Sequence, residues 1–217
     1  MRCWWPDNYD MTHRPRPGSR LRRPFILGLT GSIGMGKSTA AMMFEREGVP
    51  VFDADAEVHR LQGPGGALVA AIEARFPGTT GPKGVDRQKL GARVLGNTHE
   101  LAALEAIVHP AVGRAQKRFL ARHRARDLVV LDIPLLFEKG GWRKVGAIAV
   151  VSAPAWMQRK RVMRRSGMTA TKLKAIRRLQ VPDRVKRSRA HFIIETGRPK
   201  SETHRQIRFI ASCFHAR

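Results

Sequence analysis

Residues 31–38 read Gly-Ser-Ile-Gly-Met-Gly-Lys-Ser, and this order matches G-x-x-x-x-G-K-[ST], the spacing of a loop that holds the phosphates of a nucleotide. A strand-like apolar run at 25–30 precedes the loop, and a helix-like run at 38–48 follows it. Glycines let the backbone wrap a polyphosphate with its N–H groups pointing inward, and the following helix directs its positive end at the same anion. A chance glycine-rich turn would lack this strand–loop–helix context. The sequence therefore predicts that the chain binds ATP or GTP.

The second half of the loop and the start of the helix supply the expected nucleotide contacts. In a loop of this kind the lysine, here Lys37, reaches the β- and γ-phosphates, and the hydroxyl of Ser38 ligates Mg²⁺. We therefore expect a nucleotide site that works with a magnesium ion. The predicted ATP-binding residues are Gly34, Met35, Gly36, Lys37, Ser38 and Thr39.

The chain is strongly basic, with 41 Lys and Arg against 17 Asp and Glu and a formal net charge of +24. Such an excess implies a polyanionic ligand, a nucleic acid or an acidic surface. No zinc module or RNA-binding aromatic signature accompanies the charge, and the few aromatic residues offer little stacking surface. No apolar run approaches the roughly 20 residues that span a bilayer. We expect a small-molecule ligand, with no specific nucleic acid and no membrane partner.

The first 24 residues differ in composition from the rest, since they hold four prolines and six arginines without an apolar stretch. This pattern excludes a secretory signal, and the prolines oppose the amphipathic helix of a transit peptide. We expect a disordered basic arm at 1–24, or upstream sequence before a true start at Met11. Cys3 and Cys213 show no metal-like spacing, which favours a reduced, cytoplasmic setting.

The rest of the chain, 25–214, alternates strand-like and helix-like runs in the manner of an α/β domain with a parallel sheet. Five strands are expected, at 25–30, 49–53, 127–133, 145–151 and 191–195. The long gap between the second and third strands, 54–126, predicts an inserted helical part that binds the substrate. Three helices are expected there: Asp86 would cap the first, the second would have an apolar face, and Pro110 would lie in the first turn of the third.

A basic segment precedes the fifth strand. Between 159 and 189 there are 13 Lys and Arg, and Asp183 is the only acid. The run 168–180 is expected to be helical with Thr169 as its cap. A charge run is ordinarily a solvated face, but exposed like charges repel unless an anion neutralises them. We interpret 154–189 as a lid that closes over the phosphates of ATP.

Three acids follow predicted strands, where side chains meet at the carboxyl edge of a parallel sheet. Asp53 and Asp55 are expected on the same side of the second strand. One could accept the proton of a substrate hydroxyl while the other supports Mg²⁺ or the helix start, as phosphoryl transfer requires; both could equally be helix caps. Asp132 could hold Mg²⁺ or belong to a buried strand. The spacing of His109 does not distinguish a structural from a functional histidine.

Taken together and in order, these motifs resemble the dephospho-CoA kinase family. The resemblance extends from about Phe25 to about Gly197 and includes 28–39, Asp53 to Asp55, Val108 to Pro110, Pro134 to Glu138, Arg161, Arg165, Gln180 and 186–190. It implies a P-loop kinase fold and transfer of the ATP γ-phosphate to the ribose 3′-hydroxyl of dephospho-CoA. It also implies catalytic roles for Lys37 as the phosphate-binding lysine, Asp55 as the base and Arg165 as the lid arginine. The substrate-binding residues implied are Asp53, His109, Pro134, Leu135, Leu136, Glu138 and Arg161.

The chain departs from the family pattern at four positions. The family commonly has glycine at position 32 and a small residue at position 35, where this chain has Ser32 and Met35. It usually has aspartates where this chain has His191 and Glu195. Two other functions stay open: a nucleoside monophosphate or shikimate-type kinase, and a basic nucleic-acid-binding protein. We expect a monomer or a weak oligomer.

Overall fold

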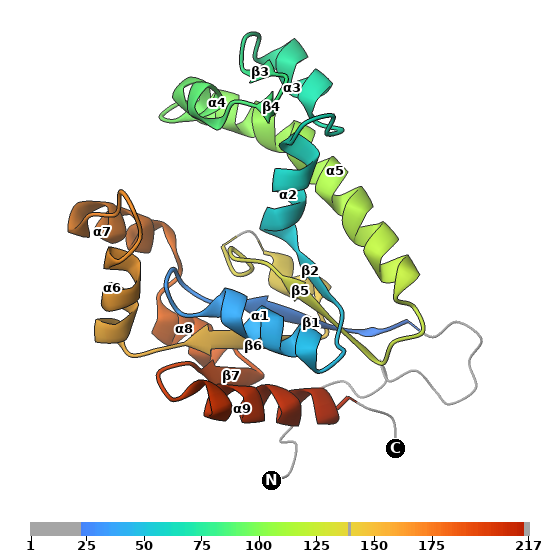
Figure 1. The fold of residues 1–217 in the computed structure, drawn as a ribbon, viewed down its shortest axis with the longest axis vertical. Coiled ribbons are helices and arrows are strands. Elements are labelled where there is room, and N and C mark those ends of the chain that lie inside the picture. Colours follow the sequence, from blue (N-terminus) through green and yellow to red (C-terminus); the bar gives the residue numbers. More distant parts are fainter. Residues whose placement is uncertain (1–22, 139, 215–217) are drawn as a thin grey trace. The chain divides into compact units, whose positions relative to one another are not determined.

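The computed structural model describes residues 23–138 and 140–214 (Figure 1), so the predicted arm at 1–24 lies almost wholly outside the described residues. Five strands form one sheet, in the order β2-β5-β1-β6-β7. The strands are β1 (Phe25–Thr30), β2 (Val51–Asp53), β5 (Leu128–Asp132), β6 (Ala147–Ser152) and β7 (Phe192–Glu195). Pairs β1–β5, β1–β6 and β6–β7 are parallel. The predicted α/β architecture and its five strands are confirmed.

The three central strands of the sheet, β5, β1 and β6, are buried except at the first two residues of β1. Every residue of β5 and of β6 is buried, which explains why these strands read as continuous apolar runs in the sequence. Leu29 of β1 lies beside Asp132 of β5 and Ala149 of β6. The residues that follow these three strands therefore emerge at one edge of the sheet, the edge where α/β proteins bind ligands.

The chain divides into two compact units. One consists of the described residues up to Val51 and from His123 onward, and the other is Phe52–Arg122. The first unit contains the sheet and these helices: α1 (Lys37–Arg46), the short 3-10 helix η2 (Gly141–Lys144), α6 (Ala155–Met163), α7 (Ala170–Leu179), α8 (Asp183–Ser188) and α9 (Lys200–Ser212). Thr169 caps α7, accepting a hydrogen bond from the Lys172 N–H at 3.2 Å, as predicted.

The second unit has its own apolar core, which includes Leu61, Ile72, Phe76, Leu90 and Ala111. It consists of α2 (Ala54–Gln62), α3 (Val69–Arg75), α4 (Arg87–Val94), α5 (Thr98–Arg122) and a two-stranded hairpin of β3 (Thr80–Gly81) and β4 (Gly84–Val85). A separate core is consistent with a part of the chain that folds as a unit.

The second unit confirms one helix prediction and corrects another. Asp86 caps α4 as expected, accepting hydrogen bonds from the N–H groups of Gln88 and Lys89. The helix predicted to begin at Pro110 does not exist as a separate element. Instead, α5 is a single helix of 25 residues that includes Pro110. Proline removes one hydrogen bond inside a helix, but here Ala111 and Ala115, which follow the proline, are buried and keep the helix packed.

Among the residues that the structure describes, no helix combines the length and the apolar character needed to cross a membrane.

Candidate active site

The phosphate loop connects β1 to α1 at the ligand-binding edge of the sheet. Gly34 and Gly36 have φ angles of 75° and 93°, in the left-handed region that favours glycine. Gly36 is the N-cap of α1, and its carbonyl accepts hydrogen bonds from the N–H groups of Thr39 and Ala40 at 3.1 Å. Lys37 and Ser38 therefore lie in the first turn of α1, where backbone N–H groups lack partners within the helix.

Lys37 forms an ion pair with Asp132, the last residue of β5. Its Nζ lies 2.5 Å from Oδ1 of Asp132, whose side chain is 2% exposed. Asp132 ends β5 beside β1, so the sheet itself brings the two residues together. The ammonium of Lys37 is thus held in the loop by a buried carboxylate, and it can also interact with phosphates.

The loop after β5 holds four predicted substrate-binding residues in different environments. Leu136 is completely buried in a cluster with Ile148 and Val150, whereas Leu135 is exposed. Pro134 is half-buried, and its carbonyl accepts a hydrogen bond from the Thr30 hydroxyl at 3.1 Å. Leu136 therefore supports the loop from within, and Leu135 is the exposed apolar side chain that it presents.

Glu138, the fourth residue of this set, forms a buried ion pair. Its Oε1 lies 2.9 Å from Nζ of Lys186, a side chain with no solvent exposure, and accepts a hydrogen bond from the Val181 N–H at 2.8 Å. Burial alone would raise the pKa of Glu138, but the Lys186 ammonium and the Val181 N–H lower this pKa below its ordinary value. The carboxylate is thus held ionised, and it ties the loop after β5 to α8.

The two predicted arginines of the lid differ in their contacts. Arg161 lies in α6 and donates to the hydroxyl of Thr196 at 3.0 Å and to its carbonyl at 2.6 Å. Arg165 is exposed and lies two residues beyond the end of α6. Arg161 therefore has hydrogen-bond partners within the protein, and the side chain of Arg165 is exposed.

The predicted residues of the second unit lie in helices or at a helix start. Asp53 is the N-cap of α2, and its carboxylate accepts a hydrogen bond from the Ala56 N–H at 2.9 Å. The prediction that Asp55 continues the strand is wrong: β2 ends at Asp53, and Asp55 is exposed in the first turn of α2. His109 is exposed within α5. The helix starts early because the Asp53 cap satisfies one of its first N–H groups.

Met35, one of the departures from the family pattern, is a core residue. It is buried, and its sulfur accepts a hydrogen bond from the Ala153 N–H at 3.2 Å. Its carbonyl accepts a hydrogen bond from the Thr196 hydroxyl at 2.6 Å. The side chain of Met35, larger than the small residue common in the family, is therefore packed in the protein core.

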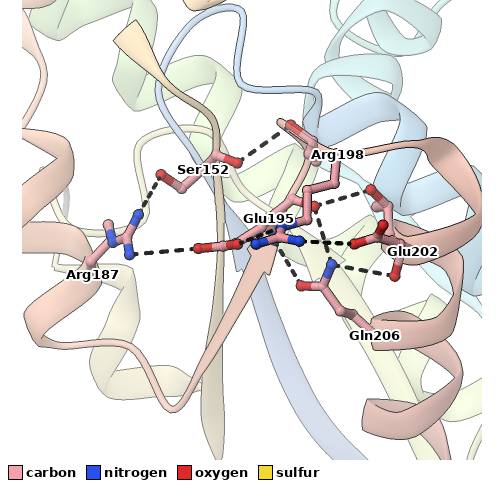
Figure 2. A network of polar contacts seen from close by, with 8 residues as sticks. Ser152, Arg187, Glu195, Arg198, Glu202 and Gln206 are labelled. Atoms are coloured by element: carbon pink, nitrogen blue, oxygen red, sulfur yellow. Dashed lines mark hydrogen bonds and ion pairs between the residues drawn. The ribbon is translucent and has the colours of Figure 1, made fainter.

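The two departures in and before β7 are also explained by local contacts. The backbone N–H of Ile148 donates to Nδ1 of His191 at 3.1 Å, and burial lowers the pKa of His191. Glu195 lies between Arg187 and Arg198, at 3.9 Å and 3.7 Å, in a network that Figure 2 shows. Both side chains connect strands to neighbouring elements.

Gln158, Gln180 and Thr196 contact the phosphate loop but were not predicted as site residues. Gln180 was noted only as part of a family motif, and the other two carried no sequence signal. All three reach the loop from more than 120 positions away along the chain. Contacts of this range depend on the tertiary fold.

In the part of the chain that the structure describes, no cluster of three or more His, Cys, Asp or Glu side chains could hold a metal ion without further ligands.

A family model described as dephospho-CoA kinase matches residues 25–200. The dephospho-CoA kinase of Novosphingobium aromaticivorans is 59% identical over 187 residues, which are 86% of this chain and 93% of that protein. The dephospho-CoA kinase of Zymomonas mobilis is 50% identical over 188 residues, 87% of this chain and 95% of that protein.

Solved structures agree with this result. The crystal structure of a Thermus thermophilus protein has a TM-score of 0.79 at 35% identity and covers 89% of this chain and 100% of that one. The dephospho-CoA kinase from Campylobacter jejuni has a TM-score of 0.61 at 21% identity, covering 87% and 96% of the two chains, a likeness of fold. With a family match over most of its length and relatives at 50% and 59% identity, the chain belongs to the dephospho-CoA kinase family.

Proposed function

We propose that this kinase transfers the γ-phosphate of ATP to the ribose 3′-hydroxyl of dephospho-CoA through the residues named above. The observation that carries the proposal is the ion pair of Lys37 with Asp132 beside a loop of left-handed glycines, at the ligand-binding edge of the sheet. Lys37 and the first N–H groups of α1 bind the β- and γ-phosphates, which replace Asp132 as the principal partner of the lysine.

Asp55 acts as the base in this proposal. As the 3′-hydroxyl oxygen bonds to the γ-phosphorus, its proton passes to the Asp55 carboxylate, and the bond from the γ-phosphorus to the bridging oxygen of ADP breaks. Asp55 suits this role because its side chain is exposed. Asp53, which is bound to the Ala56 N–H, keeps the start of α2 in place.

A magnesium ion fits the residues present. Mg²⁺ keeps several waters and is bound through one or two protein oxygens together with substrate phosphates. Ser38, exposed in the first turn of α1, and Asp132 would hold the ion. When bound, Mg²⁺ neutralises charge on the transferred phosphate.

Arg165 completes the proposal as the arginine of the lid. Its exposed position beyond α6 leaves the guanidinium able to approach the phosphates when the segment between α6 and α7 closes. Leu135, Pro134 and His109 are proposed to contact the acceptor.

In the test, the purified protein is incubated with ATP and one of three acceptors: dephospho-CoA, AMP or shikimate. ADP release and the mass of the product are measured. We expect turnover with dephospho-CoA, a product heavier by one phosphate, and ADP release dependent on Mg²⁺. Preference for AMP or shikimate would overturn the assignment of acceptor. RNA binding that persists at high salt would favour the nucleic-acid alternative, since incidental binding to a basic protein falls steeply with salt.

A cytoplasmic location and a monomer or weak oligomer remain part of the proposal. Cell fractionation and sedimentation of the purified protein are the measurements that check them.

A further inference from the structure

We propose that Gln158 and Gln180 are positioning residues that clamp Ile33 of the phosphate loop from both sides and so orient the loop for ATP. The Ile33 N–H donates to Oε1 of Gln180 at 3.1 Å. The Ile33 carbonyl accepts a hydrogen bond from Nε2 of Gln158 at 2.8 Å. A backbone N–H can only donate and a carbonyl can only accept, so Gln180 must present its oxygen and Gln158 its nitrogen.

The Gln158 contact fixes the direction of a loop N–H group. In a trans peptide the carbonyl oxygen and the following N–H point in opposite directions, and no described peptide bond is cis. Because the Ile33 carbonyl points at Gln158, the Gly34 N–H points away from α6. The same reasoning applies two residues later, where the Met35 carbonyl accepts a hydrogen bond from Thr196 and the Gly36 N–H points the opposite way.

Gln158 belongs to a helix that lies directly against the loop. Its side chain is buried, and a Cβ atom added to Gly34 would lie 2.5 Å from Cγ2 of Val162 and 3.1 Å from the carbonyl of Gln158. Glycine at position 34 is therefore required by the close approach of α6 as well as by its φ angle. This packing leaves little freedom for the Gln158 amide, so the contact is rigid.

Gln180 follows the last residue of α7, and its side chain is half-buried. The next residue, Val181, donates its N–H to Glu138, which pairs with the buried Lys186. Two glutamines of the segment 154–189, one in α6 and one directly after α7, thus contact the same residue of the loop. We expect loss of either contact to weaken ATP binding roughly 10- to 100-fold, because a partly buried backbone group of Ile33 would lose its hydrogen-bond partner.

The test uses one chemical change at two positions. Glutamate at 180 keeps an oxygen that accepts from the Ile33 N–H, whereas glutamate at 158 has no proton to give to the Ile33 carbonyl. The variants are Gln158→Glu, Gln158→Leu, Gln180→Glu and Gln180→Leu. The measurements are ATP affinity by calorimetry without acceptor, kcat, the KM of each substrate, and the melting temperature.

We expect ATP affinity to fall strongly in both variants at 158 and in Gln180→Leu, and to recover in Gln180→Glu although that variant also adds a negative charge. The KM of dephospho-CoA should stay within about twofold of wild type, since the contacts are on the ATP side. A merely structural role would lower the melting temperature and the active fraction while leaving the KM of ATP unchanged. That pattern, or a Gln180→Glu variant no better than Gln180→Leu, would overturn the proposal.

Amide hydrogen exchange in the wild-type protein tests the clamp if a variant does not fold. The Ile33 amide should exchange slowly without ATP, and the Gly34 amide should become protected only when ATP is added. An Ile33 amide that exchanges as fast as that of Gly34 would contradict the clamp. The inference rests on the proposed function only for ATP as the ligand. Absence of turnover with dephospho-CoA would therefore refute the proposed acceptor, while ATP binding by the variants would still test the clamp.

Discussion

The phosphate loop and the acids after β2 differ in what holds them. Lys37 contacts a residue 95 positions away, and Ile33 contacts residues 125 and 147 positions away. Asp53 instead bonds to Ala56, three positions away, and Asp55 is exposed in the first turn of α2. The first set belongs to the unit that contains most of the sheet, and the second to the unit Phe52–Arg122.

This difference indicates how the two substrates are handled. The fold of one unit fixes the loop before any ligand arrives, so we expect ATP to meet a preformed site. The proposed base depends on a local helix start in the other unit. Substitutions around the loop should therefore act on ATP binding and phosphate transfer, and substitutions in α2 on proton transfer. The following predictions test this division.

The largest effect is expected for the proposed base. Asp55→Asn should lower kcat by about 10²- to 10⁴-fold, since an amide cannot take the proton of the hydroxyl. Asp53→Asn should cost little, because asparagine caps a helix as well as aspartate does. The measurement is kcat at saturating ATP and acceptor, with calorimetry showing unchanged ATP affinity in both variants. A greater loss in Asp53→Asn would mean that the two acids have exchanged roles.

Lys37→Ala should lower kcat by roughly 10²- to 10³-fold, the scale of losing one charge-stabilising group in a transition state. Its melting temperature should also fall, because the buried carboxylate of Asp132 loses one ion-pair partner. Lys144→Ala removes an exposed lysine of the same unit and serves as the control. Turnover near that of wild type in folded Lys37→Ala would refute the role of the lysine.

Arg165→Ala should lower kcat by about 10- to 100-fold while changing ATP affinity only modestly. An exposed arginine contributes little to binding in the open protein, and its charge-assisted contacts strengthen when closure excludes water. Arg164→Ala, which removes the adjacent exposed arginine, is the matched control. Equal losses in the two variants would indicate a diffuse electrostatic effect and not a contact of Arg165.

The smallest effect is a pH dependence of stability at His191. Burial lowers the pKa of this histidine from its ordinary value of 6.5, so below pH 6.5 the unfolded chain binds a proton that the folded protein resists. The free energy of unfolding should therefore fall as the pH falls. His191→Asn keeps an acceptor for the Ile148 N–H and should show a shallower fall between about pH 7 and pH 5.

The sequence predicted the strands well because a buried parallel strand is an uninterrupted apolar run. Residues 25–30 match β1 fully, and the other predicted strands differ by one or two residues at one or both ends. Pro110 was misjudged because propensity treats proline as a helix start, while the packing of Ala111 and Ala115 is a tertiary effect. The motif at 31–38 identified the phosphate loop, since its chemistry depends on adjacent residues.

The residues that hydrogen-bond to the phosphate loop could not be predicted, because they reach it only through the tertiary fold. Gln158 lies in a basic helix and resembles a surface residue in the sequence, yet its side chain is buried. Arg161 was expected to bind the substrate, and its contact with Thr196 was not foreseen. Whether a polar side chain in such a helix faces water or the loop is decided by how α6 packs after β6, which no local pattern encodes.

The burial of Lys186 makes this lysine a probe of local opening, both in cells and in purified protein. In so basic a chain most amines react with acylating reagents, but a lysine without solvent exposure can react only when α8 opens. Mass-spectrometric acylation at this single position would therefore report how often that helix detaches from Glu138. If ATP slows the labelling, the nucleotide is stabilising a segment outside the loop that binds its phosphates.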